Sequence, residues 1–98
     1  MKEQQQLDIH LSEEIAQGVY SNLAIITHSN AEFIVDFVAM MPGIPKANVR
    51  SRIVMTPQNT KRFLNALAEN IKKFEEHNGF IKEASIEIPI IGNNGASA

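Results

Sequence analysis

The chain has 98 residues, of which 44% are apolar and 20% are charged, and its formal net charge is -2. This length suits one hydrophobic core, and the composition is that of a globular domain, not of a disordered, collagen-like or membrane-spanning chain. The sequence contains no cysteine, which excludes disulfides, thiolate metal sites and a cysteine nucleophile. Because the N-terminus is polar and no apolar run approaches the ~20 residues of a membrane helix, we expect a cytoplasmic protein with no membrane partner.

The N-terminal residues carry weak secondary-structure signals. Residues 1–6 form a polar lead that we expect to be flexible, and residues 7–91 form the single expected domain. Residues 7–11 alternate apolar and polar side chains with a period of two, which predicts a strand. Ser12 could cap a short helical turn, but Gly18 follows too soon for a stable helix, so we expect a connector here.

The next segments predict an antiparallel meander. Residues 19–28 and 32–40 are mainly β-compatible and are separated by the turn-forming residues 29–31, so they should form a hairpin. Residues 41–46 contain two prolines and a glycine, which cannot continue a ladder. Residues 47–56 are the next expected strand.

A long amphipathic helix should follow. Thr56 can cap its free N–H groups, Pro57 suits its first position, and the helix should end near His77, where Asn78 and Gly79 supply a C-terminal cap. Its apolar residues form one continuous stripe that we expect to pack on a face of the sheet: Phe63, Leu64, Leu67, Ile71 and Phe74.

The C-terminal residues alternate again. Residues 84–91 carry a row of isoleucines interrupted by Pro89, which confines this strand to a sheet edge or to pairing with another chain. Residues 92–98 are expected to be a flexible tail. The predicted fold class is therefore α+β: an antiparallel meander of three to four strands, then one long amphipathic helix packed on one sheet face, with a C-terminal edge strand.

The residues that could carry chemistry form no catalytic constellation. The histidines lie on different expected elements, without the spacing of metal ligands: His10, His28 and His77. Asp36 is an acid flanked by apolar residues on an expected strand, and an ion pair with Arg50 or Arg52 on the neighbouring strand explains it simply. No nucleophile elbow and no glycine-rich phosphate loop is present. We expect a protein without enzymatic activity, cofactor or metal.

The strand of residues 32–40 is apolar on both faces. One helix covers only one face of a sheet, so the other face would expose more apolar surface than a monomer normally tolerates. We interpret this surface as an oligomer interface, with a groove for an apolar segment of a partner as the alternative. The candidate residues are Phe33, Ile34, Val35, Phe37 and Val38.

Basic residues concentrate in one stretch. Five of the nine lysines and arginines fall within residues 46–62, with no acid between them: Lys46, Arg50, Arg52, Lys61 and Arg62. Such a group could bind the phosphates of a nucleic acid. Exposed aromatic residues for base stacking are not interleaved with it, so a solvated or acid-paired basic face is the alternative.

Several short motifs also resemble a known family. They are Glu14-Ile15-Ala16-Gln17-Gly18-Val19-Tyr20-Ser21-Asn22-Leu23-Ala24, His28-Ser29, Glu32-Phe33, Asp36-Phe37, Pro42-Gly43, Ser51-Arg52-Ile53 and Thr56-Pro57. Together they resemble a small prokaryotic domain of unknown function, over roughly residues 7–77. The resemblance brings no catalytic residue. It implies gene neighbourhoods that contain RNA polymerase large-subunit genes, and hence a transcription-linked accessory role.

At the level of fold, the meander followed by a long helix is similar to the SecB-like export chaperones, which bind unfolded apolar segments. The chain lacks the long acidic surface and second helix of those chaperones. The leading hypothesis is therefore a non-catalytic, homo-oligomeric binding or accessory protein. The alternatives are a nucleic-acid-binding or RNA polymerase-associated protein that uses the basic residues, and a peptide-binding chaperone with an unfolded client.

Overall fold

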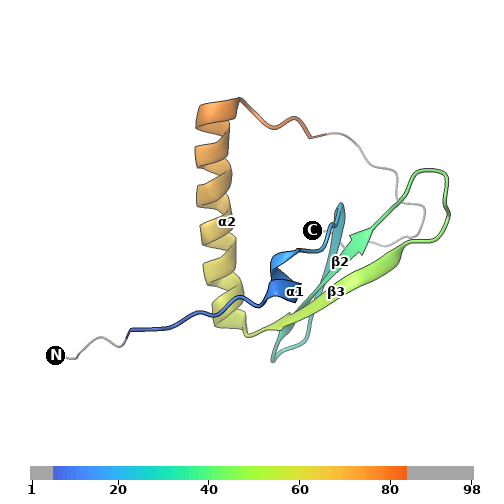
Figure 1. The fold of residues 1–98 in the computed structure, drawn as a ribbon. Helices are drawn as coiled ribbons and strands as arrows, with labels where there is room; N and C mark the ends of the chain where they lie inside the picture. Colours follow the sequence, from blue (N-terminus) through green and yellow to red (C-terminus); the bar gives the residue numbers. More distant parts are fainter. Residues whose placement is uncertain (1–5, 84–98) are drawn as a thin grey trace.

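The computed structural model describes residues 6–83 (Figure 1). In chain order it contains helix α1 (Glu13–Ala16), strands β1 (Leu23–His28), β2 (Phe33–Ala39) and β3 (Asn48–Met55), and helix α2 (Pro57–Asn78). The strands form one antiparallel sheet in the order β1-β2-β3. The predicted α+β meander followed by a long helix is confirmed. The expected C-terminal strand and tail lie outside the described residues.

The segment before the sheet is less regular than its pattern predicts. Residues 7–11 are not a strand, and their three large apolar side chains are exposed. The predicted strand is wrong because an alternating segment needs a neighbouring backbone to complete its ladder, and no strand of residues 6–83 pairs with it. The segment expected as a connector contains a short helix, α1, in which the Ser12 hydroxyl accepts a hydrogen bond from the Ile15 N–H at 3.3 Å.

Side-chain hydrogen bonds close both ends of the β1–β2 hairpin. The Ser29 hydroxyl accepts hydrogen bonds from the backbone N–H groups of Ala31 and Glu32, at 3.1 and 3.3 Å. At the open end, the Asn22 side chain donates to the Met40 carbonyl at 3.0 Å and accepts from the Met40 N–H at 2.8 Å. These bonds satisfy backbone groups where the ladder ends, so β1 and β2 are shorter than the predicted strands.

A tight turn and a bulge shape the β2–β3 connection. Gly43 has a φ of +78°, which glycine adopts without steric cost, beside a hydrogen bond from the Ile44 N–H to the Met41 carbonyl at 3.2 Å. Along the ladder, the register shifts between Phe37 and Val38.

The shift moves one valine to the other side of the sheet. Phe37 pairs with Ser51, whereas Val38 pairs with Val49, so Arg50 is the extra residue on β3. The sequence pattern predicts that Val49 shares a face with Ser51, and the bulge makes this wrong. From Ser51 to Met55 the side chains alternate between the two faces as the sequence pattern predicts, with Ser51, Ile53 and Met55 opposite to Arg52 and Val54.

The strand pairing defines two faces of the sheet. The residues of what we call the Phe face are Ala24, Ile26, His28, Phe33, Val35, Phe37, Ala39, Asn48, Ser51, Ile53 and Met55. The residues of the opposite face, the Asp face, are Leu23, Ile25, Thr27, Ile34, Asp36, Val38, Val49, Arg52 and Val54.

Helix α2 begins and ends as predicted. The Thr56 hydroxyl accepts a hydrogen bond from the Asn59 N–H at 3.1 Å, and Pro57 occupies the first position. At the other end the Gly79 N–H donates to the Glu75 carbonyl at 2.9 Å, with a φ of +93° at the glycine. At 1.5 Å per residue, the 22 residues of α2 extend about 33 Å.

The apolar stripe of α2 is not covered by the sheet. Figure 1 shows the helix diverging from the end of β3. No residue of α2 is buried, and the stripe is 41–59% exposed: Phe63, Leu64, Leu67, Ile71 and Phe74. The packing expected from the sequence is therefore absent within this part of the chain. A single extended residue, Thr56 (φ -70°, ψ 156°), joins β3 to α2, so the direction of the helix is set directly at the end of the strand.

The core of the described residues is very small. Of these residues, only Val35 and Val38 are buried among the apolar ones, at 4% and 3% exposed. Both belong to β2, the central strand, and they lie on opposite faces of the sheet. A domain normally buries the inner face of its sheet against a second layer. Residues 6–83 of a single chain do not supply that layer.

Candidate interaction surface

The Phe face is the more uniformly apolar side of the sheet. At its centre Val35 pairs with Ile26 on β1 and Ile53 on β3, which are 47% and 42% exposed. Phe33 and Phe37 lie on either side of Val35 along β2 and are half-buried. The face carries no Asp, Glu, Lys or Arg side chain.

The polar members of the Phe face lie at its margins. His28 is the last residue of β1 and its ring packs against the Phe33 ring, with centroids 5.3 Å apart. Ser51 pairs with Phe37 next to the bulge. Ile26 and Ile53, the apolar residues on either side of the buried Val35, are therefore available for apolar contact.

The Asp face carries an ion pair at its centre. Arg52 donates two hydrogen bonds to Asp36, from Nε to Oδ1 at 2.7 Å and from Nη2 to Oδ2 at 2.9 Å. The Arg52 hydrogen bond, with its charge, lowers the pKa of the Asp36 carboxyl against the opposing effect of burial. The Asp36 side chain is 13% exposed and that of Arg52 is 62% exposed. The predicted cross-strand ion pair is confirmed, with Arg52 as the partner.

Apolar residues surround this ion pair. Ile34 is half-buried on β2, and Ile25 and Val54 are exposed on the outer strands. Of the candidate residues from the sequence, Ile34 and Val38 lie on the Asp face, and the other three lie on the Phe face. The two apolar faces predicted for β2 are present, but they differ in chemistry because only one has a paired charge at its centre.

The five basic residues do not gather in one place. Lys46 precedes β3, whereas Lys61 and Arg62 lie in α2, beyond the opposite end of that strand (Figure 1). The 8 residues of β3 span about 25 Å. Arg50 is the bulge residue and Arg52 is in the ion pair. The structure therefore divides the predicted polyanion patch into separate groups.

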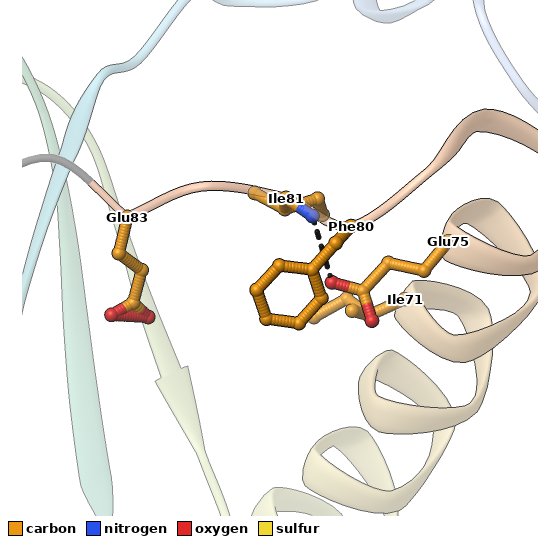
Figure 2. Close-up of a pocket in the computed structure, with 5 residues that line it drawn as sticks. All are labelled: Ile71, Glu75, Phe80, Ile81 and Glu83. Carbon is orange, nitrogen blue, oxygen red and sulfur yellow. Dashed lines mark hydrogen bonds between the residues drawn. The ribbon is translucent and has the colours of Figure 1, made fainter.

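An apolar extension of α2 was missed from the sequence. Phe80 and Ile81, directly after Gly79, are 83% and 42% exposed. Figure 2 shows them with part of α2 around a hollow of about 380 Å³ that is lined by Ile71, Glu75, Phe80, Ile81 and Glu83. The available signal was the apolar pair next to the glycine that ends the helix, since such residues often contact its last turns.

A hydrogen bond from a backbone N–H to a side-chain carboxylate holds this extension against the helix. The Ile81 N–H donates to Glu75 Oε2 at 3.0 Å (Figure 2). The lining of the hollow combines three apolar side chains with two carboxylates. Because Ile71 belongs both to the stripe and to the hollow, the apolar surface of α2 continues beyond the end of the helix.

Residues 6–83 contain neither a metal site nor a membrane-spanning helix. No group of three histidine, aspartate or glutamate side chains in this range could hold a metal ion. Neither helix of this range combines the length and the apolar character needed to cross a membrane. The apolar surfaces are thus the main features that the described part of the chain offers.

These surfaces lie within a region shared with other proteins. The family model described as "Protein of unknown function (DUF3467)" matches residues 1–83. The chain belongs to the DUF3467 family. This confirms the resemblance to a small domain of unknown function. No curated protein and no solved structure matches the chain, so the SecB-like similarity is not confirmed.

The DUF3467 match spans every surface described above. The sheet, α2 and the hollow at Phe80 all lie within residues 1–83. The family description assigns no activity, so a proposal about this DUF3467 protein has to come from its own residues.

Proposed function

We propose that this protein is a non-catalytic, homo-oligomeric binding or accessory protein whose exposed apolar surfaces make the assembly. One observation carries the proposal: the described residues bury two valines, while the α2 stripe and the Phe face remain open. Monomeric soluble proteins rarely expose contiguous apolar patches larger than a few hundred Å². We place the protein in the cytoplasm, because a chain without cysteine suits a reducing compartment.

The size of these surfaces supports self-association. The five stripe residues, with Ile26 and Ile53, are each 41–59% exposed. Covering the exposed half of such a side chain removes on the order of 80 Å², worth about 2 kcal/mol at roughly 25 cal/mol per Å². Seven such side chains in each chain give a gross gain that exceeds the ~4–15 kcal/mol cost of association.

Light scattering coupled to size-exclusion chromatography tests the proposal. At micromolar concentration, the full chain should have a mass that is a multiple of its own 10.9 kDa. Ile53→Asp should lower that mass, because it places a charge on the Phe face. Val54→Asp is the matched control, since Val54 is the next residue and lies on the other face. A strict monomer for the unmodified chain contradicts the proposal.

Peptide binding is the second candidate, because exposed apolar surfaces also suit an unfolded client. This role predicts that the protein suppresses aggregation of a denatured test protein such as reduced lactalbumin. It also predicts that Ile53→Asp weakens the suppression more than Val54→Asp does. If neither the parent nor the control protects the test protein, the chaperone alternative is wrong, whereas the oligomer proposal is unaffected.

A further inference from the structure

We infer that the assembly is a reciprocal dimer, in which α2 of each chain lies across the Phe face of a second copy. The inference rests on the homo-oligomeric function proposed above and specifies its interface. Three features carry it: the junction between β3 and α2, the match between the stripe and the Phe face, and the ion pair on the Asp face.

The junction directs α2 away from its own sheet. Thr56 alone separates Met55, the end of β3, from Pro57, the start of α2. The Thr56 carbonyl accepts from the Thr60 N–H at 3.0 Å and from the Thr60 hydroxyl at 2.8 Å. With the Thr56 side chain bonded to the Asn59 N–H as well, the first turn of the helix is fixed to the strand end. The sheet that α2 covers therefore belongs to another chain.

The stripe and the Phe face match in length and chemistry. From Phe63 to Phe74 the stripe rises about 16 Å along the helix. From Phe33 to Phe37 the Phe face extends about 14 Å along β2, and its three strands are about 10 Å across. A helix with its side chains is about 10 Å wide. One α2 therefore covers one Phe face, with apolar side chains on both sides of the contact.

The Asp face is a poorer site for the same helix. A helix lying on it would place apolar side chains over the Asp36–Arg52 pair and remove water from Arg52, which is 62% exposed. Desolvating an ion pair in this way costs more than the attraction returns unless further hydrogen bonds are formed. The stripe residues of α2 have no polar side chain with which to form them. The Phe face, which has no such pair, is the favoured one.

Two copies are sufficient because each chain brings one stripe and one Phe face. A twofold axis pairs both stripes with both faces and leaves neither unmatched, so the assembly closes as a dimer. The seven side chains that are 41–59% exposed in each chain lose on the order of 1,100 Å² in total, if each contributes about 80 Å². The half-buried Phe33 and Phe37 add to this, which brings the interface into the range of about 1,200–2,000 Å² for stable complexes.

Cross-linking of the full chain tests this arrangement, because the chain has no cysteine of its own. A Leu67→Cys chain is mixed with an Ile53→Cys chain, allowed to exchange subunits, and treated with a short bismaleimide. The expected product is a covalent dimer that contains one chain of each kind, as identified by mass spectrometry. The matched control replaces the Ile53→Cys chain with a Val54→Cys chain, for which this product should be at least several-fold weaker.

The other outcomes distinguish a failure of the α2 exchange from a failure of the homo-oligomer proposal. Two results would contradict the helix exchange but not the homo-oligomer, provided that light scattering still shows a dimer. In the first, Leu67→Cys cross-links only to Leu67→Cys. In the second, it cross-links equally to Ile53→Cys and to Val54→Cys. A monomer overturns both the helix exchange and the homo-oligomer. In that case, a cross-link within one chain of the Leu67→Cys/Ile53→Cys double variant shows that α2 returns to its own sheet. A monomer without that cross-link leaves another occupant, such as residues 84–98 of the chain, over these surfaces.

A second pair of cysteine positions replaces the first pair if one of its variants does not fold. Circular dichroism of each single variant shows whether its helix signal matches that of the parent. If Leu67→Cys or Ile53→Cys fails this check, Ile71→Cys on the stripe and Ile26→Cys on the Phe face give the same test, with Ile25→Cys as the control on the Asp face.

Discussion

Asp36 and Arg52 are opposite each other on neighbouring strands and share two hydrogen bonds. The hydrogen bond from Arg52 lowers the pKa of Asp36 in the folded chain. A lowered carboxyl pKa contributes stability that is present above the unfolded value of about 3.9 and is lost as pH falls through the folded value. The ion pair should therefore stabilise the fold at neutral pH and not in strong acid.

Asp36→Asn tests this contribution. At pH 7 the variant should have a lower free energy of unfolding than the parent, and the difference should shrink as pH falls below about 4. Urea denaturation followed by circular dichroism at several pH values measures both quantities. Asp8→Asn, on an exposed residue before the sheet, is the control and should show no such difference. A pH-independent gap for Asp36→Asn contradicts the assignment.

The cap of α2 gives a second prediction at the residue scale. Thr56→Ala removes the hydroxyl that accepts from the Asn59 N–H and should lower the free energy of unfolding by about 1 kcal/mol. Thr56→Ser keeps the hydroxyl and should retain most of the parent's stability. Thermal denaturation of the two variants distinguishes them. Equal losses in Thr56→Ala and Thr56→Ser show that the cap is not the stabilising contact.

The partner of Asp36 and the position of Val49 are features that the sequence pattern does not determine. The alternation around Asp36 predicts a cross-strand arginine, but it does not choose between Arg50 and Arg52. The choice depends on a bulge, which changes the register by one residue and leaves no mark in the apolar pattern. For the same reason, the pattern assigns Val49 to the wrong face.

Among the elements, α2 is predicted best because its signals are local. The cap residue, the proline at the first position and the glycine after the last turn all lie within or beside the helix itself. The strand expected at residues 7–11 fails because a strand depends on a neighbour that its own sequence does not specify. The local pattern likewise does not predict which surface covers the α2 stripe, since an apolar face indicates burial but does not identify the contacting residues.

Leu67→Glu tests the stripe as an element. Leucine and glutamate have similar helix propensities, so the change leaves the local preference of α2 nearly unaltered. It places a charge at the centre of the stripe, which should reduce the assembly mass and lower the melting temperature at a given chain concentration. Asn65→Glu, on the solvent side of the same helix, should change neither. Light scattering and circular dichroism give the two readouts, and equal effects in both variants contradict a role for the stripe.

For the whole molecule, the proposed assembly should link stability to association, because residues 6–83 bury only two apolar side chains. If association supplies the missing layer, the apparent melting temperature should rise with chain concentration, because dissociation and unfolding occur together. Differential scanning calorimetry over a wide range of concentration measures this. A monomeric domain with the same sequence would melt at a constant temperature, and that result contradicts an obligate assembly.

The charge distribution bears on the nucleic-acid alternative at the same scale. The net charge is -2, and the five basic residues of the 46–62 stretch are divided among the segment before β3, β3 itself and α2. We expect weak binding to duplex DNA or to RNA, with a small dependence on salt, since each phosphate contact adds about 0.9 to the slope of log affinity against log salt. Fluorescence anisotropy at several salt concentrations measures the slope. Tight binding with a steep salt dependence would support nucleic-acid binding instead, if Arg50→Ala and Lys61→Ala reduce that dependence.

The two-valine core has a consequence for the life of the protein in a cell. If the protein forms the proposed dimer, a newly made chain that has not yet associated would present its apolar helix and sheet to proteases and chaperones, which act on unassembled chains. Its half-life should then depend on how fast other copies are made nearby. A modest fall in the synthesis rate would lower the abundance of the protein by a larger fraction than the synthesis rate itself. Abundance would then respond to expression with a threshold and not in proportion.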